Sequence, residues 1–255
     1  MDALTSSDHW DDVWLASSLP SEVVKGRRAY VDAITDVFDT HLASGTAIEL
    51  GGAVGAWAAY LIRNRAYDLT ILDYAPAGVS LTRRNLDLLG LQADVVLGDM
   101  FAADLGQFDL VYSLGVIEHF DDTCGAVAAH LRFAKPGGMI MVGCPNYRGA
   151  NKAFARYVAP AKLAEHNLNA MRIDQWPAMF ERKLGLTPIF RGYVGGFEPL
   201  MHKVPEGRRL DKRAVAVAMK LTGGAFNLRV ARPLRRLNHP LWSNYCLGIY
   251  RVSGL

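Results

Sequence analysis

The chain of 255 residues has few cysteines, no long apolar run and little charge imbalance, and each of these absences excludes a class of protein. Cys124, Cys144 and Cys246 are too few and too widely spaced for a disulfide framework or a paired-cysteine zinc site, so we expect reduced thiols. No run of about 18 apolar residues occurs, and the acidic N-terminal segment lacks the basic start and apolar core of a signal peptide. The 28 basic and 25 acidic residues leave a net charge of +3, which is no argument for nucleic-acid binding. We therefore expect a soluble cytoplasmic protein.

Short apolar runs are abundant, and 51% of the residues are apolar. From Thr46 onward, five β-rich runs alternate with helical patterns, and two later runs begin at Leu186 and Tyr245. This alternation predicts an α/β fold with a mostly parallel sheet and helices on both faces. Before the sheet, residues 21–42 have apolar residues at helical spacing, with Ser21 as the expected N-cap.

A glycine-rich turn, "AIELGGAVGAW", follows the first predicted strand. Glycines at such a turn adopt positive φ angles and let the backbone approach a ligand closely. A Walker-type phosphate loop would end in Gly-Lys-Ser/Thr, and this turn ends in "GAW". The dinucleotide spacing G-x-G-x-x-G also fails, because Ala53 and Ala56 occupy its second and third glycine positions. A turn that only packs strand on helix remains the alternative to a ligand site.

Further polar residues stand at the ends of the later predicted strands. Asp73 closes the second strand about twenty residues after the glycine turn, where an acid can accept hydrogen bonds from both hydroxyls of a ribose. Asp99 closes the third strand, and Ser113 lies in "SLGVIEHF" at the end of the fourth. Because ligands of open α/β sheets bind at the carboxyl ends of the strands, these residues together predict one cleft.

Glu49 and the glycine turn, Asp73, Asp99, "SLGVIEHF" and "LRFAKPGGMIMVGCPN" occur in an order that resembles class I methyltransferases that use S-adenosylmethionine. The resemblance implies a seven-stranded sheet, with Glu49 acting on the amino-acid end of the cofactor, Asp73 on the ribose, and Asp99 and Met100 on the adenine. Ala53 departs from the usual E-x-G-x-G-x-G pattern. The implied cofactor-binding residues are Glu49, Gly51, Gly52, Ala53, Gly55, Asp73, Tyr74, Asp99, Met100, Ser113, Leu114 and Gly115.

The same resemblance divides the chain, taken as a single methyltransferase domain, into three parts. Residues 1–45 are expected to form a helical lid or flank, and residues 46–146 the cofactor-binding core. Residues 147–255 would supply the acceptor-binding segment, a helical insertion and the last strands. Within the insertion, residues 203–236 carry ten basic and two acidic residues, which fits a solvated basic face, an anionic acceptor, a peripheral membrane contact or a partner subunit. The oligomeric state stays open.

His119 and His166 are the candidate bases for methyl transfer to a hydroxyl, since such an acceptor must lose a proton. For each, the alternative is a histidine that shapes the pocket or packs. Pro145, Asn146 and Gly149 with His166 and Asn167 resemble a group of bacterial sequences near carbohydrate and natural-product pathways. Trp10 and Trp14, which share a helical face, and Tyr147 are the expected acceptor contacts, with core packing as the alternative for the tryptophans.

The tetrapeptide N/D-P-P-Y of adenine and glutamine N-methyltransferases is missing after the fourth strand, and no RNA-binding module is apparent. These absences favour a small-molecule acceptor and no nucleic acid. We expect O-methylation of a sugar or specialised metabolite, with N-methylation of an amino sugar or small amine as the alternative. A non-catalytic cofactor-binding protein is the second alternative. No metal-binding cluster is clear in the sequence, so no metal ligands are assigned, and a Mg²⁺-dependent variant stays open as an alternative.

Overall fold

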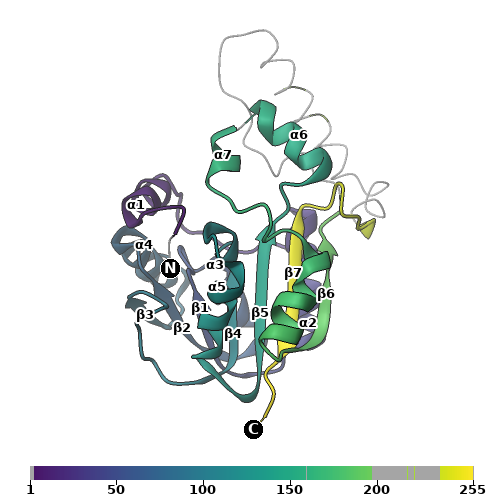
Figure 1. The fold of residues 1–255 in the computed structure, drawn as a ribbon. Helices are drawn as coiled ribbons and strands as arrows, with labels where there is room; N and C mark the ends of the chain where they lie inside the picture. Colours follow the sequence, from purple (N-terminus) through teal and green to yellow (C-terminus); the bar gives the residue numbers. More distant parts are fainter. Residues whose placement is uncertain (1–2, 159, 197–216, 218–220, 222–235, 255) are drawn as a thin grey trace.

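A computed structural model describes residues 3–158, 160–196, 217, 221 and 236–254 of the chain. Seven strands form one sheet in the order β3-β2-β1-β4-β5-β7-β6 (Figure 1). All neighbouring pairs up to β5 are parallel, whereas β7 is antiparallel to both β5 and β6. The strands are β1 (Gly45–Leu50), β2 (Tyr67–Asp73), β3 (Asp94–Leu97), β4 (Phe108–Leu114), β5 (Ala134–Pro145), β6 (Thr187–Val194) and β7 (Tyr245–Arg251). The mostly parallel seven-stranded sheet predicted from the sequence is confirmed.

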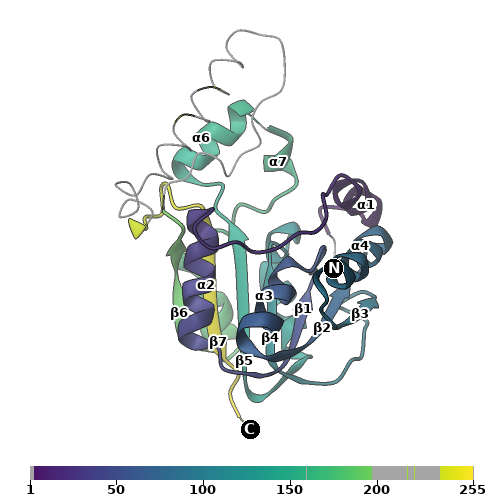
Figure 2. The ribbon, with the colours of Figure 1, turned by 180° about the vertical axis from the view of Figure 1, so that it is seen from behind.

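Helices cover both faces of this sheet, and others lie at the edge where the parallel strands end (Figures 1 and 2). The helices are α1 (Ser7–Leu15), α2 (Ala29–His41), α3 (Ala56–Arg65), α4 (Pro76–Leu89), α5 (Thr123–Leu131), α6 (Gly149–Val158) and α7 (Pro160–Ala164), with short irregular helices η1 (Ile117–His119), η2 (Ile173–Gln175) and η3 (Pro177–Lys183). α2, α3 and α4 cover one face, and α5 and η3 cover the other. α1, α6 and α7 lie at the carboxyl edge.

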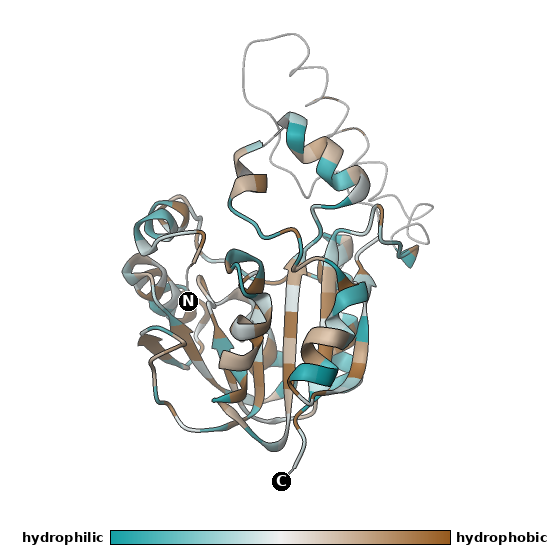
Figure 3. Ribbon diagram, viewed as in Figure 1, coloured by the Kyte–Doolittle hydropathy of each residue, from teal (hydrophilic) through white to brown (hydrophobic). Residues whose placement is uncertain are grey.

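Two hydrophobic cores result from the alternation of side chains along the strands. In β1, Ile48 and Leu50 pack in the core beneath α5 and η3, while Ala47 packs in the core beneath α2 and α3. Figure 3 shows apolar residues along much of the central strands, and a mixture of polar and apolar residues in the helices around them. Because both faces of the sheet are covered, the sequences of the parallel strands are nearly continuous apolar runs.

The predicted helix over residues 21–42 is wrong in its first third. α2 begins only at Ala29, after Arg28 in extended conformation, and Ser21 does not cap it. Instead the backbone N–H of Ser21 donates to Asn85 Oδ1 at 2.7 Å, and Asn85 Nδ2 donates to the Ser21 carbonyl at 3.0 Å. Asn85 is fully buried, so its amide needs these partners. A long-range contact therefore overrides the local capping preference.

α1 is the helical flank expected near the N-terminus, and its polar side chains determine where it lies. Ser6 caps α1 by accepting a hydrogen bond from the His9 N–H. Asp11 Oδ1 accepts from the Ala77 N–H at 2.8 Å and so caps α4, which has no capping side chain of its own. The Leu4 N–H donates to the His119 carbonyl at 2.8 Å. These bonds place α1 over the carboxyl edge, beside α4.

The basic segment 203–236 falls outside the described residues except for positions 217, 221 and 236. Among the helices of the part that is described, none is both long and apolar enough to cross a membrane.

Trp176 is the largest fully buried side chain of the described residues, and it packs on Phe180 while its indole N–H donates to the Ala170 carbonyl at 2.8 Å. We expect Trp176→Ala to lower the free energy of unfolding by about 3–5 kcal/mol, because it leaves a cavity and removes the indole N–H that donates to the Ala170 carbonyl. Leu88→Ala, at a side chain that is 56% exposed in α4, is the control and should change it by less than about 1 kcal/mol. Urea unfolding measures both, and equal losses would contradict the assignment of Trp176 to the core.

Candidate active site

A cavity of about 570 Å³ opens at the carboxyl edge of the sheet and receives residues from the strand ends, α1 and the segment after α7. Most of the residues predicted from the sequence line it, namely Trp10, Trp14, Gly51, Ala53, Asp73, Tyr74, Asp99, Met100, Leu114, Gly115, His119, Tyr147 and His166. Four predicted residues do not line it, namely Glu49, Gly52, Gly55 and Ser113. Ligands of open α/β sheets bind at this edge, so the cavity is the candidate active site.

The glycine turn between β1 and α3 is packed too tightly for side chains. Gly51 has φ +67°, and a Cβ there would lie 2.6 Å from Val116 Cγ2. A Cβ on Gly52 would lie 2.8 Å from Glu49 Cδ and from Ile71 Cγ2. Glu49 therefore lies directly behind the turn, on the side away from the cavity. Its carboxyl group supports the turn and lies outside the cavity lining.

Glu49 is held in the core by Tyr112, whose hydroxyl donates to Glu49 Oε2 at 2.9 Å. Only 3% of the Glu49 surface is exposed. Burial raises the pKa of Glu49 to about 8, because a buried carboxylate loses its hydration, and the Tyr112 hydrogen bond opposes this rise.

Ala53, which stands where the class I pattern has glycine, is accommodated by a glycine elsewhere. A Cβ on Gly78 of α4 would lie 2.9 Å from Ala53 Cβ and 2.9 Å from Trp14 Cδ1. The missing side chain at Gly78 thus leaves room for the methyl group of Ala53 and for the indole of Trp14. The methyl group at position 53 therefore packs toward α4 and α1.

Asp73 joins the end of β2 to the glycine turn. Its Oδ2 accepts from the Ala53 N–H at 3.1 Å, and its Oδ1 accepts from the Ala75 N–H at 2.9 Å. Burial raises the pKa of Asp73, and the backbone hydrogen bonds act in the opposite direction. Each carboxylate oxygen has a second lone pair, so Asp73 can still accept hydrogen bonds from a ligand in the cavity.

Asp99 lies two residues beyond β3, not at its end as predicted, and Oδ1 accepts from the Phe101 N–H at 2.9 Å. Arg132 at the end of α5 donates to the Met100 carbonyl at 3.1 Å and to the Ala103 carbonyl at 3.1 Å. These bonds fix the loop that carries Asp99 and Met100 at the cavity wall.

Ser113 is completely buried and lies outside the cavity lining. Its hydroxyl is 2.9 Å from His130 Nε2, and His130 Nδ1 is 2.9 Å from the Ala126 carbonyl. Burial lowers the pKa of His130 to about 4, so this ring is neutral. Ser113 thus joins β4 to α5, and β4 meets the cavity through Leu114 and Gly115.

Aromatic side chains from α1 form the wall of the cavity opposite the strand ends. The rings of Trp10 and Trp14 stack at 5.5 Å, and Trp10 meets the His119 ring edge-on at 4.9 Å. The Tyr74 hydroxyl donates to the Thr5 carbonyl at 3.3 Å, which also ties the N-terminal segment to β2. The two tryptophans thus share a helical face, as predicted, and that face borders the cavity.

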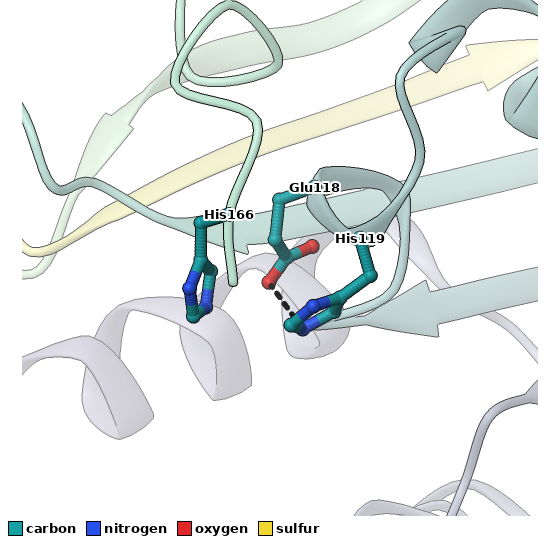
Figure 4. A group of neighbouring side chains, drawn as sticks. All are labelled: Glu118, His119 and His166. Carbon is teal, nitrogen blue, oxygen red and sulfur yellow. Dashed lines mark ion pairs between the residues drawn. The ribbon is translucent and has the colours of Figure 1, made fainter. Parts of the chain in front are cut away.

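The second histidine, His166, lies beside the first. The ring centroids of His119 and His166 are 4.6 Å apart, and those of Tyr147 and His166 are 5.0 Å apart. Burial raises the pKa of Tyr147 to about 12, so its hydroxyl stays protonated at neutral pH. Figure 4 shows the Glu118 carboxylate between the two imidazole rings. Its Oε1 is 3.9 Å from His119 Nε2.

Sequence reasoning did not identify several lining residues as part of the site, namely Arg28, Tyr30, Trp57, Glu118, Asn244 and Tyr245. A signal for the last two does exist: an antiparallel last strand must begin at the edge where the parallel strands end, and Tyr245 pairs with Pro145. Nothing in the local sequence marks Arg28, which is the only Lys or Arg among the described lining residues.

Because Glu49 has a pKa of about 8 in the folded state, against 4.5 ordinarily, the folded protein binds more protons than the unfolded chain between these values. Its contribution to stability therefore falls as the pH rises from 4.5 to 8. As the pH rises from 5 to 8, we expect the free energy of unfolding of Glu49→Gln to rise by roughly 2–4 kcal/mol relative to that of wild type. Urea unfolding at several pH values measures this difference. Glu22→Gln on the surface is the control, and parallel profiles for wild type and Glu49→Gln would contradict the assignment.

A family model described as a methyltransferase domain matches residues 24–191, which is more than half of the chain. A search of the curated proteins finds no match.

Among solved structures, a "putative sarcosine dimethylglycine methyltransferase from Galdieria sulphuraria" has a TM-score of 0.58 at 14% identity, covering 97% of this chain and 98% of the other. A methyltransferase from Geobacter sulfurreducens in complex with S-adenosyl-L-homocysteine has a TM-score of 0.56 at 14% identity, covering 94% and 95%. A structure titled "Conversion of a Disulfide Bond into a Thioacetal Group during Echinomycin Biosynthesis" has a TM-score of 0.57 at 20% identity, covering 97% and 92%. The chain therefore belongs to the methyltransferase-domain family and has the fold of the class I, S-adenosylmethionine-dependent methyltransferases.

Proposed function

We propose that this methyltransferase transfers the methyl group of S-adenosylmethionine to a hydroxyl of a small molecule, either a sugar or a specialised metabolite. The observation that carries the proposal is the cluster of Glu118, His119 and His166, which lies in the same cavity as Asp73 and Asp99. The acids at the strand ends suit the hydroxyl and amino groups of an adenosine. The imidazoles suit an acceptor that must lose a proton.

The cofactor half of the site is the half next to β1, β2 and β3. Asp73 would accept hydrogen bonds from the ribose, and Asp99 would accept one from the adenine amino group while Met100 packs on the ring. The backbone of Gly51 and Ala53 would pass beneath the methionine portion. Arg28 suits a carboxylate, since its guanidinium offers paired donors. When bound, S-adenosylmethionine supplies the electrophilic methyl group of its sulfonium.

The acceptor half is bounded by Trp10, Tyr147 and the two histidines. The Nδ1 of His119 is 2.9 Å from the Glu165 carbonyl, which can only accept, so this nitrogen carries the proton and Nε2 has a lone pair. A hydroxyl positioned there can give up its proton as it attacks the methyl group in line with the sulfur. The aromatic wall from α1 excludes water from the reacting atoms.

Neither the volume of the cavity nor the fold identifies the acceptor, so the residues of the site must indicate it. A cavity of about 570 Å³ suits a cofactor with a small acceptor. The solved proteins of this fold carry titles that name an amine-methylating enzyme in one case and a disulfide conversion in another. The fold therefore does not select the acceptor, and the histidine cluster is the feature that favours oxygen.

Methylation assays on matched acceptors test whether the enzyme methylates oxygen or nitrogen. The full chain is incubated with S-adenosylmethionine and pairs of sugars that differ only in a hydroxyl or an amino group, and mass spectrometry locates the added methyl. Methyl transfer to the hydroxyl members supports the proposal. Transfer only to the amino members would replace it with N-methylation, and binding of S-adenosylmethionine without turnover on any acceptor would favour the non-catalytic alternative.

Asp73→Asn should weaken binding of S-adenosylhomocysteine by about 10-fold to 100-fold, because it removes the charge and one acceptor oxygen facing the ribose. Isothermal titration calorimetry measures the affinity. Asp68→Asn, at an exposed position in the same strand, is the matched control and should bind as wild type does. Unchanged affinity in Asp73→Asn would refute the ribose assignment.

His166→Ala should reduce turnover on a hydroxyl acceptor by about 100-fold or more while leaving the affinity for S-adenosylhomocysteine unchanged, because His166 lies at the acceptor end of the cavity. Single-turnover assays separate the chemical step from product release. His41→Ala, which removes a histidine at the end of α2, is the control. Full turnover in both His166→Ala and His119→Ala would exclude an acceptor-side role for the two histidines.

A further inference from the structure

Glu118, His119 and His166 place one carboxylate and two imidazoles around a common point. One ligating atom from each lies within 4.8 Å of the other two. The sequence did not suggest a metal site, because His166 is 47 residues beyond His119 and no short spacing joins them. We propose that these three side chains bind a divalent first-row transition-metal ion at the acceptor end of the cavity. This inference rests on the proposed function and specifies how the hydroxyl is activated.

The backbone already holds the two ligand-bearing segments together. The Asn167 N–H donates to the Glu118 carbonyl at 2.7 Å. The Asn167 side-chain amide donates to the carbonyls of Phe120 and Asp121, each at 2.9 Å. Asn167 therefore fastens the segment after α7 to η1, and His166 is placed beside Glu118 as a result. Ligand separations in a tetrahedral zinc site are about 3.4 Å, so small rotations of the side chains complete the set.

The orientation of His119 is the one that a metal ligand requires. Its Nδ1 donates to the Glu165 carbonyl at 2.9 Å, and its Nε2 faces Glu118. Histidines that bind metals generally donate their second ring N–H to a carbonyl or carboxylate, which fixes the tautomer and the ring orientation. Glu165 directly precedes His166, so the carbonyl that orients one ligand belongs to the segment that carries the other.

Glu118 supplies an independent observation. Its side chain is 1% exposed, and among the residues that the structure describes its buried Oε2 has no hydrogen-bond partner. A buried carboxylate oxygen without a partner costs free energy, and native structures rarely retain one without a reason. Glu118 also lines the cavity, and its other oxygen, Oε1, faces His119 Nε2, so a cation held by both carboxylate oxygens would satisfy Oε2 as well. A bound ion would therefore explain why a carboxylate is buried at this position.

The donor set determines the class of ion. Two imidazole nitrogens and one carboxylate are typical of catalytic zinc sites and of open sites for divalent iron, whereas Mg²⁺ and Ca²⁺ prefer oxygen ligands. Three protein ligands leave a coordination position open toward the cavity. The acceptor hydroxyl fits that position, since the ligands lie at the acceptor end.

Coordination of the hydroxyl to such an ion lowers its pKa. The hydroxyl proton passes to water, and the alkoxide stays bound to the ion. An alkoxide lone pair then forms the O–CH₃ bond while the S–CH₃ bond breaks, and the sulfur keeps the bonding pair. The products are the methyl ether and S-adenosylhomocysteine. The two histidines then serve as ligands, and their loss still lowers turnover as expected above.

Metal titration of the full chain tests the site without an acceptor. The protein is produced without a polyhistidine tag, stripped with EDTA, and titrated with Co²⁺ by visible absorption and with Zn²⁺ by calorimetry. We expect one ion per chain and visible Co²⁺ bands of a nitrogen and oxygen site. His166→Ala and Glu118→Gln should weaken binding by about 100-fold or more. His41→Ala, whose ring packs on Phe190 outside the cavity, should bind as wild type does.

The outcomes separate this inference from the proposed function. Each variant is also titrated with S-adenosylhomocysteine, and we expect wild-type affinity throughout. Absence of Co²⁺ and Zn²⁺ binding in a wild-type protein that binds S-adenosylhomocysteine would overturn the metal site and leave methyl transfer intact. Undiminished metal binding in His166→Ala would overturn it as well. If Glu118→Gln does not fold, as judged by circular dichroism, His166→Ala decides the question, since His166 is only partly buried.

Discussion

The close packing of the glycine turn against the buried Glu49 carboxyl is the constraint on which the cofactor half of the site depends. Gly52 and the Glu49 side chain leave no room for a Cβ between them. Tyr112 holds the same carboxyl from β4, so β1, the turn and β4 are fixed by one contact. Asp73 then ties the Ala53 N–H to β2. The backbone floor of the cavity is therefore rigid before any ligand enters, which lowers the cost of ordering it on binding.

The acceptor half is built by different means. Its groups come from α1, from η1 and from the segment after α7, which are distant in the sequence. Three sets of hydrogen bonds join them: the backbone bonds from Leu4 to His119 and from Asn167 to Glu118, and the bonds from the Asn167 side-chain amide to the carbonyls of Phe120 and Asp121. None of these bonds depends on the sheet itself. The acceptor half can therefore change in sequence without disturbing the cofactor half, which fits a fold that serves many acceptors.

The parts that the sequence predicted well depend on local patterns. The strands and the glycine turn after the first strand follow from apolar runs and glycine spacing, and the structure confirms them. The assignment of Asp73 and Asp99 to one cleft also followed, because the ends of parallel strands meet at one edge. Resemblance to a known family, rather than periodicity, supplied the chemistry expected of these residues.

The parts that sequence reasoning missed depend on long-range contacts. Ser21 lost its capping role to Asn85, and Ser113 faces His130 rather than the cavity. Ala53 looked like a departure from the family pattern, but Gly78 of the neighbouring helix makes room for it. No spacing rule joins His166 to Glu118, since long-range hydrogen bonds of Asn167 and of the Glu165 carbonyl bring them together.

A buried carboxylate has opposite meanings in the two halves of this site. Glu49 has Tyr112 as a donor and lies behind the turn, so its role is complete without a ligand. Glu118 has a buried oxygen without a hydrogen-bond partner and lies on the cavity, between two imidazoles. Burial disfavours charge equally in both places, and burial alone would not separate them. What separates them is whether the described residues supply the partner: Tyr112 does so at Glu49, whereas none does so for Glu118 Oε2, and Glu118 is therefore the carboxylate that a ligand in the cavity can satisfy.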